Sequence, residues 1–466
     1  MRLSPASRLA VIVLLALSAC TGDKKGPGNT AEPYRLFVAH QGDVTSFDYE
    51  TGEELPGSVQ QAHGPTDLQV LADGTVLVNL TDHGQILIVD GKTMNVVRRP
   101  ESSTLGAVRP VHSYLTPERN GRAYWLTLND GTGNRVETNS VRFVDVHPGS
   151  ATYLQPVGEV GLGVGHHKAA FSTSVERAVI TNIADCNNVL SVYDYSDVTA
   201  IKALMTIGSA ELGWDGSSFP KTCDPTYQAG VPPAPHGCGT SAQSHKTYCN
   251  VTASGELVAV DLDATPPAFA RITTHGKGGG YTKAHPGGAF IYSLQGEPRE
   301  GKGGAPCQIG QLVVLDAATD KVALELPLLY EGPACTRALV GTDEETTEPS
   351  HMLVSEDGKT LFVTAAGGFG VPTARVRQHL VVDISNPTAA QQQPSIAIGT
   401  STSYHGDALT GDGKYLFVAN NQDATVSQID TASRTVVKTL RVHDAPQTLG
   451  TYHSSTGPSE QTGPIP

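Results

Sequence analysis

Seven histidines recur along this 466-residue chain at intervals that resemble a structural repeat. The step is 49 residues from His63 to His112 and 54 residues from His351 to His405. Neutral imidazole is a good ligand for zinc, copper and nickel, and several convergent histidines favour these metals over calcium or magnesium. The candidate metal ligands are His63, His112, His166, His167, His236, His351 and His405.

Other residue patterns carry weaker chemical signals. A histidine at the start of a strand often only donates a hydrogen bond to a neighbouring carbonyl group, so each histidine alone could be structural. The paired carboxylates Glu344 and Glu345 in GTDEETTEPSH are more typical of a solvated acidic loop than of a catalytic pair. The chain contains no GxSxG, HExxH or phosphate-binding glycine motif, so the common hydrolase and nucleotide sites are not indicated.

The elements that would position the histidines read as short strands. The segment 405–442, HGDALTGDGKYLFVANNQDATVSQIDTASRTVVKTLRV, divides into four strands separated by Gly, Asp and Asn turns. Comparable units begin near residues 63, 112, 166, 236, 281 and 351, and most of them begin with histidine. In the unit from 281, His275 and His285 are both candidates, and the sequence does not choose between them.

Strand units repeating every 40–50 residues or so predict an all-β fold, a β-propeller. We count eight blades, with seven as the alternative. The segment after Tyr34 supplies only the later strands of a unit, and the tail 447–455 could supply its missing first strand and close the ring. The first strand of each propeller blade lines the central channel, so the histidines are expected to form a ring at one mouth of that channel.

The N-terminus indicates export. Arg2 and Arg8 precede the 11-residue apolar run LAVIVLLALSA, which is too short to span a bilayer, and Cys20 follows. The stretch LSAC resembles a bacterial lipobox, which implies cleavage before Cys20 and its lipidation. The expected organisation is a signal peptide (1–19), a flexible tether (20–33), a propeller (34–455) and a disordered tail (456–466). We expect a periplasmic or cell-surface lipoprotein, with the outer membrane favoured over the inner.

Composition narrows the classes of partner. The chain carries a formal net charge of −14, with 50 glycines and 30 prolines. This composition is typical of a turn-rich folded protein. An anionic surface repels phosphate backbones, so we expect no nucleic-acid partner.

Six cysteines remain after Cys20 is set aside, and an even number in an exported protein predicts disulfides. Fifteen pairings are possible. Cys307 precedes GQLVVLD and Cys335 follows KVALELPLLY, two segments that read as an antiparallel hairpin whose ends would bring these cysteines together. No CxxC pair is present, so a structural zinc knuckle is not indicated.

The repeat also resembles the YVTN-type propeller repeat of exported proteins. The stretches GHHKAAFS and PHG…YCNVTASGELVAV resemble periplasmic zinc metallochaperones that serve zinc ABC transporters. That resemblance implies zinc binding through histidines, delivery to a periplasmic solute-binding protein, and a disulfide between Cys223 and Cys249. The chain lacks the His-rich flexible loop that such chaperones tend to carry.

A more distant resemblance is to the nitrous oxide reductase propeller, in which histidines hold a copper cluster. This chain lacks the cupredoxin-like domain of that enzyme, so nitrous oxide reduction is not expected.

Three hypotheses follow. The first is a lipid-anchored, non-enzymatic propeller that binds or delivers zinc, with copper as the alternative metal. The second is a propeller enzyme, a lactonase or a metal-dependent oxidoreductase. The third is a cell-surface scaffold for protein interactions, in which the histidines are structural. The sequence favours the first and leaves enzymatic activity open.

Overall fold

Eight antiparallel sheets make up the computed structural model of this protein. It describes residues 32–60, 62–106, 109–130, 139–165, 168–213, 235–251, 254–274, 277–300, 306–328, 348–366, 376–401 and 406–459. The chain divides into a unit spanning Met1–Glu32 and a unit spanning Pro33–Pro466, and the sheets belong to the second. None of the helices in the described ranges is long and apolar enough to cross a membrane.

Each sheet is one blade, with its strands in chain order from the centre outward. The strands of blades 2 to 4 are β4 (Pro65–Val70), β5 (Thr75–Leu80), β6 (Gln85–Asp90), β7 (Asn95–Arg98), β8 (Pro110–Leu115), β9 (Tyr124–Asn129), β10 (Asn139–Asp145), β11 (Pro156–Leu162), β12 (Ala169–Phe171), β13 (Arg177–Thr181), β14 (Leu190–Asp194) and β15 (Lys202–Ile207). Those of blades 5 and 6 are β16 (Pro235–Thr240), β17 (Lys246–Val251), β18 (Glu256–Asp261), β19 (Ala268–Thr273), β20 (Lys277–Ala284), β21 (Phe290–Glu300), β22 (Pro306–Asp316) and β23 (Lys321–Leu328). Those of blades 7 and 8 are β24 (Glu348–Val354), β25 (Thr360–Ala366), β26 (Val376–Asp383), β27 (Gln391–Ser401), β28 (Asp407–Leu409), β29 (Tyr415–Asn420), β30 (Thr425–Asp430) and β31 (Thr435–Arg441). Two short 3₁₀ helices, η1 (Thr81–His83) and η3 (Pro387–Ala389), complete the described helical elements.

Blade 1 joins the two ends of the propeller. It contains β1 (Arg35–His40), β2 (Asp43–Asp48) and β3 (Glu53–Gln60) from the start of the chain, and β32 (Pro446–His453) and β33 (Gly457–Pro458) from its end. Strand β32 pairs with β1 in antiparallel register, with Leu36 opposite Thr451 and Val38 opposite Leu449. The eight-bladed propeller closed by a C-terminal strand is therefore confirmed. Strand β33 lies within the segment expected to be a disordered tail.

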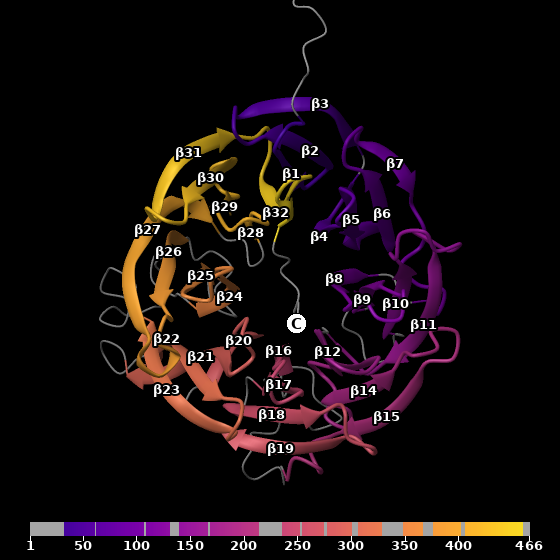
Figure 1. Cartoon of the computed structure of the whole chain (residues 1–466), viewed down its shortest axis with the longest axis vertical. Coiled ribbons are helices and arrows are strands. Elements are labelled where there is room, and N and C mark those ends of the chain that lie inside the picture. Colours follow the sequence, from indigo (N-terminus) through magenta and orange to yellow (C-terminus); the bar gives the residue numbers. More distant parts are fainter. Residues whose placement is uncertain are drawn as a thin grey trace, which may run out of the picture. The chain divides into compact units, whose positions relative to one another are not determined.

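The first strands of the blades surround one axis. Figure 1 shows β32, β4, β8, β12, β16, β20, β24 and β28 nearest the centre of the Pro33–Pro466 unit, with the exposed fourth strands outside. Neighbouring first strands lie close together. At Gly239 in β16, an added Cβ would lie 2.9 Å from the Cα of Lys283 in β20, so only glycine fits there.

Apolar side chains fill the spaces between successive blades. Every residue of the second strands β1 and β5 is buried, because these strands lie between inner and outer neighbours and have packed faces on both sides. One buried cluster joins blades 1 and 2 through Phe37, Val44, Val76 and Leu87, and similar clusters join the other blades. By contrast, all four residues of the outermost strand β7 are exposed. This packing makes the inner strands a rigid frame for the side chains on the axis.

One disulfide lies in blade 5 and corrects an expected pairing. Cys238 in β16 bonds to Cys249 in β17, and the two residues are also directly opposite in the strand register. Cys249 is therefore not bonded to Cys223, as the family resemblance implied. Cys186 is also disulfide-bonded. The predicted hairpin between the strands near Cys307 and Cys335 is confirmed as β22 and β23, but Cys223 and Cys335 lie outside the described residues.

We expect the Cys238–Cys249 disulfide to stabilise the protein. Because it closes a loop with a sequence separation of 11 residues, the chain-entropy estimate of its contribution is about 3 kcal/mol. Replacing both cysteines with serine should shift the urea unfolding midpoint downward by a corresponding amount. The variant should be compared with the parent protein with and without reductant. An unchanged midpoint would show that the unfolded chain gains no freedom when this bond is lost.

Candidate functional site

Two of the predicted histidines occupy equivalent places on inner strands. His112 lies opposite Leu128 and His351 lies opposite Thr364, in each case the fifth residue of the second strand of the blade. A register shift precedes both histidines, between Pro110 and His112 and between Pro349 and His351. Both side chains are buried, with 4% and 0% of their surface exposed. The repeat therefore places these two histidines at equivalent, buried positions of inner strands.

The same place in other blades holds different polar residues. It is Asp67 in blade 2, opposite Asn79, and Tyr281 in blade 6, opposite Leu294. In blade 4 it is Lys168, whose backbone carbonyl accepts a hydrogen bond from the amide of Thr181. The channel wall therefore mixes imidazole, carboxylate, ammonium and phenol groups instead of repeating histidine.

The other predicted histidines differ in position. His63 is exposed, precedes β4, and has its ring centroid 5.2 Å from that of His83. His236 is half-buried in β16. His166, His167 and His405 lie outside the described residues, as does Cys20. Among the described residues, no group of three ligand atoms within 4.8 Å of one another includes His63, His112, His236 or His351.

The best-defined channel contact joins blades 7 and 8. Nδ1 of His351 lies 2.8 Å from Oδ1 of Asp407, and both side chains are completely buried. The hydroxyl of Thr364 donates a hydrogen bond to the other oxygen of Asp407. Burial alone would raise the pKa of Asp407, but His351, His379 and Thr364 together hold this pKa below its usual value. This contact has an ion-pair distance without regular hydrogen-bond geometry at Nδ1.

A second buried histidine, His379, lies beside this pair. It comes from the third strand β26, opposite Thr364 in β25, and is 0% exposed. Neither of its ring nitrogens has a hydrogen-bond partner among the described residues. Burial lowers the pKa of His379 to about 4, and the nearby Asp407 opposes this change only in part. At neutral pH His379 is therefore an uncharged imidazole with a free lone pair.

The opposite part of the channel contains a buried cation between carboxylates. Nζ of Lys168 lies 3.3 Å from Nδ1 of His112. Burial lowers the pKa of Lys168 to about 7, although Asp67 and Asp130 act in the other direction. Burial also raises the pKa of Asp67 to about 6, against hydrogen bonds from Ser113 and the charge of Lys168. The Lys168 amine and the His112 ring are therefore hydrogen-bonded partners inside the channel.

Electrostatic contacts across the axis join the two parts. Burial raises the pKa of Tyr281 in blade 6 well above its usual value, and the carboxylates of Asp407 in blade 8 and Asp67 in blade 2 raise it further. Tyr114 in blade 3 is buried and shifted in the same direction, with Tyr281 and Asp67 among the causes. These side chains belong to blades on opposite sides of the ring. They therefore share one low-dielectric channel.

The carboxyl ends of the inner strands form an apolar mouth. A pocket of about 510 Å³ is lined there by the ends of β4, β8, β24 and β28 and by Pro458 of β33. The histidines lie toward the amino ends of the same strands. The channel is thus polar toward one mouth and apolar at the other.

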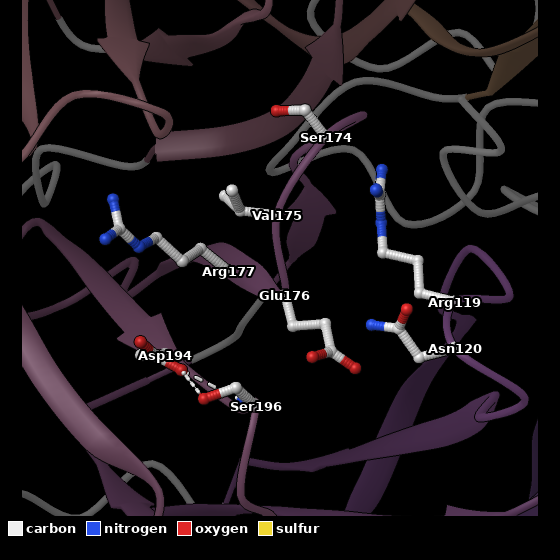
Figure 2. Close-up of a pocket in the computed structure, with 8 residues that line it drawn as sticks. All are labelled: Arg119, Asn120, Ser174, Val175, Glu176, Arg177, Asp194 and Ser196. Carbon is white, nitrogen blue, oxygen red and sulfur yellow. Dashed lines mark hydrogen bonds between the residues drawn. The ribbon is translucent and has the colours of Figure 1, made fainter.

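A second pocket, of about 550 Å³, lies on the turns of blades 3 and 4 and is drawn in Figure 2. Figure 2 shows Glu176 between Arg119 and Asn120 on one side and Arg177 and Asp194 on the other. Its charged groups already have partners: Glu176 pairs with Arg122 at 2.5 Å, and Arg177 donates to the carbonyls of Leu262 and Ala264 at 2.7 Å. The buried channel group around Asp407 is the stronger candidate site.

Several of these residues were not predicted. The sequence pattern of histidines at the start of each unit does not include Asp67, Lys168, Lys283, His379 or Asp407. Their signal is a buried polar residue next to a buried apolar run, as in HLVV at 379–382 and DAL at 407–409.

Comparison with known proteins supports the fold. No family model matches the chain, and no curated protein matches it in sequence. Among solved structures, apo AztD from Citrobacter koseri is similar with a TM-score of 0.54 and 12% identity, over 93% of this chain and 99% of that one. The periplasmic gluconolactonase PpgL from Pseudomonas aeruginosa gives a TM-score of 0.53 at 14% identity, over 90% and 99% of the two chains. The dihydro-heme d1 dehydrogenase NirN gives 0.52 at 15% identity, over 89% and 74%. At these identities the similarity shows that the chain has the fold of these proteins.

Proposed function

We propose that this protein is an extracytoplasmic, lipid-anchored propeller that binds zinc, or alternatively copper, through histidines of its central channel. Export is supported by the signal-like segment 1–19 and by Cys20, and by the similarity to a gluconolactonase described as periplasmic. The match to AztD supports the resemblance to periplasmic zinc metallochaperones. In this role the metal is cargo, and the physiological partner is a periplasmic metal-transporter binding protein.

The observation that carries the proposal is the arrangement of His351, His379 and Asp407. Oδ1 of Asp407 lies 2.8 Å from Nδ1 of His351, and carboxylates are common neighbours of the histidines that bind zinc. His379 adds a buried, neutral ring whose nitrogens lack a partner among the described residues. A buried polar group without a partner costs free energy unless a water or an ion satisfies it. The donor set therefore fits a nitrogen-preferring transition metal.

The remaining predicted ligands would complete the site. His405 precedes Asp407 by two residues, and His166 and His167 immediately precede Lys168. We therefore propose His351, His379 and His405 as the main ligands, with His112, His166 and His167 as further candidates. Imidazole ligands exchange readily because protons compete for them, which suits a protein that must release its metal.

The test is metal binding by variants of the main ligands. Metal-free protein should bind Zn²⁺ or Cu²⁺ tightly, and His351→Gln and His379→Gln should each weaken binding by at least about 10–100-fold. Competition against a chromophoric chelator measures the affinity. His245→Gln is the matched control, because His245 lies beside Asp263 but is half exposed on an outer turn. Equal affinities for parent and both channel variants would exclude metal binding by this group.

A further inference from the structure

A second cluster of metal-ligating side chains lies where the propeller closes. His40 ends β1, Asp43 begins β2, and His443 lies between β31 and β32. One ligand atom from each lies within 4.8 Å of the other two, and no other trio of His, Cys, Asp and Glu in the described ranges is as close. The cluster joins residues 400 positions apart, at the seam between the first and last parts of the ring.

His40 is already oriented as a ligand would be. It is completely buried, its Nδ1 lies 3.1 Å from the carbonyl oxygen of Asp444, and its Nε2 lies 2.9 Å from the hydroxyl of Thr45. A carbonyl oxygen can only accept, so the ring proton is on Nδ1 and Nε2 carries the lone pair. A metal-bound histidine usually donates its other ring N–H to a backbone carbonyl or carboxylate in this way. A metal at Nε2 would replace the hydrogen bond with the Thr45 hydroxyl.

One ligand atom of Asp43 and one of His443 lie within 4.8 Å of a ring nitrogen of His40. Nε2 of His443 lies 3.1 Å from both carboxylate oxygens of Asp43, and the amide of Gln60 donates to the same carboxylate at 3.3 Å. The rings of His40 and His443 are 4.2 Å apart between centroids. Zinc–nitrogen and zinc–oxygen bonds of about 2.0–2.2 Å require ligand atoms less than about 4.2 Å apart. Small side-chain movements would therefore bring the three atoms to coordination distance.

The cluster is closed on the protein side and open to solvent on the other. The side chain of His443 is 46% exposed, whereas that of Asp43 is 12% exposed and His40 is buried. A metal ion could reach the site past His443, and water could fill the fourth coordination position. Two imidazoles and one carboxylate favour zinc, copper or nickel over calcium and magnesium.

We propose that His40, Asp43 and His443 form a second transition-metal site, separate from the channel, which clamps the closure of the ring. The metal would tie the turn between β1 and β2 to the link between β31 and β32. The folded ring holds the three ligands together, and the unfolded chain does not. Bound metal therefore stabilises the closed ring by mass action.

The experiment is zinc titration of the full chain in a His351→Gln/His379→Gln background, which removes two of the three main ligands proposed for the channel. We expect one equivalent of zinc to remain bound, and the melting temperature to rise by about 3 °C when free zinc exceeds its Kd 100-fold. Adding His443→Ala or Asp43→Asn to this background should abolish binding of the remaining equivalent of zinc. It should also abolish the rise in melting temperature that zinc causes. His443 is half exposed, so its replacement should leave the fold of the metal-free protein intact.

Controls separate this site from simple surface binding. His245→Ala removes another exposed histidine beside a carboxylate and should change neither result, and Mg²⁺ should not replace Zn²⁺. If His443→Ala and Asp43→Asn bind zinc like their background, the cluster is only an ion pair and the inference is wrong. If instead the channel proposal is wrong, the variants His351→Gln and His379→Gln should bind as much zinc as the parent protein. The two proposals are therefore tested by different results.

Discussion

Asp407→Ala is expected to lower the free energy of unfolding by about 3–5 kcal/mol. Asp407 is completely buried, accepts a hydrogen bond from the hydroxyl of Thr364, and lies at ion-pair distance from Nδ1 of His351. Its removal leaves the Thr364 hydroxyl without its acceptor and the His351 ring without its carboxylate inside a low-dielectric channel. It also removes the carboxylate that favours the charged form of Lys283. Leaving buried polar and charged groups without partners is among the most destabilising effects of a single substitution.

Urea unfolding of metal-free protein at pH 7.5 measures this effect without a contribution from bound zinc. The matched control is Asp357→Ala, which removes an exposed aspartate paired with exposed Lys359 at 3.3 Å. Surface pairs of this kind contribute little, so the control should unfold almost like the parent protein. If the two variants lose equal stability, Asp407 does not act as a buried hydrogen-bond acceptor.

The fold was predictable because its information is local and repeated. The phrase DGKYLFVANNQDATVSQID contains the turn residues and the apolar second strand of a blade, and the structure forms β29 and β30 from it. The missing first strand of the first unit pointed to the tail, which forms β32. Each unit must bury its faces against neighbours, so the number of units predicts the number of blades.

The site was only partly predictable because it depends on register and on contacts across the ring. The start of a unit can be located in the sequence to within a few residues, but a shift of one residue turns a strand side chain to the opposite face. His112 and His351 share a register, whereas His63 precedes its strand and is exposed. His379 could not be found from strand starts because it reaches the site from a third strand.

Side chains joined by ring closure were hidden for a different reason. His40 and His443 lie at opposite ends of the sequence, and neither occupies the repeated histidine position. Only closure of blade 1 brings them together. The disulfide pairing also depends on strand register. The family resemblance implied that Cys249 pairs with Cys223, whereas the register places Cys238 directly opposite Cys249, and these two residues form the bond.

Lys283→Met is expected to flatten the pH dependence of stability above neutral pH. Lys283 lies in the inner strand β20 and is 6% exposed. Burial lowers the pKa of Lys283 to about 7, and Asp407 compensates only in part. An unfolded chain keeps this lysine protonated up to about pH 10.4. Between these two values the unfolded state binds one more proton than the native state, so Lys283 makes the parent protein more stable as pH rises.

The size of this contribution follows from the difference in bound protons. One proton corresponds to about 1.4 kcal/mol per pH unit, so the cost of burying Lys283 is absent above about pH 10.4 and grows as pH falls toward 7. Methionine has a similar volume and no charge, and it removes this slope. At pH 7 the Met variant should therefore be more stable than the parent, by an amount on the order of 4 kcal/mol.

Urea unfolding of metal-free parent and Lys283→Met protein at pH 7, 8 and 9 measures both slopes. Lys359→Met is the control, since the side chain of Lys359 is 63% exposed. The slope of the Met variant should be lower than that of the parent by about 1.4 kcal/mol per pH unit, and the control should match the parent. Parallel curves for parent and Lys283→Met would mean that Lys283 keeps its proton in the folded channel, held there by Asp407.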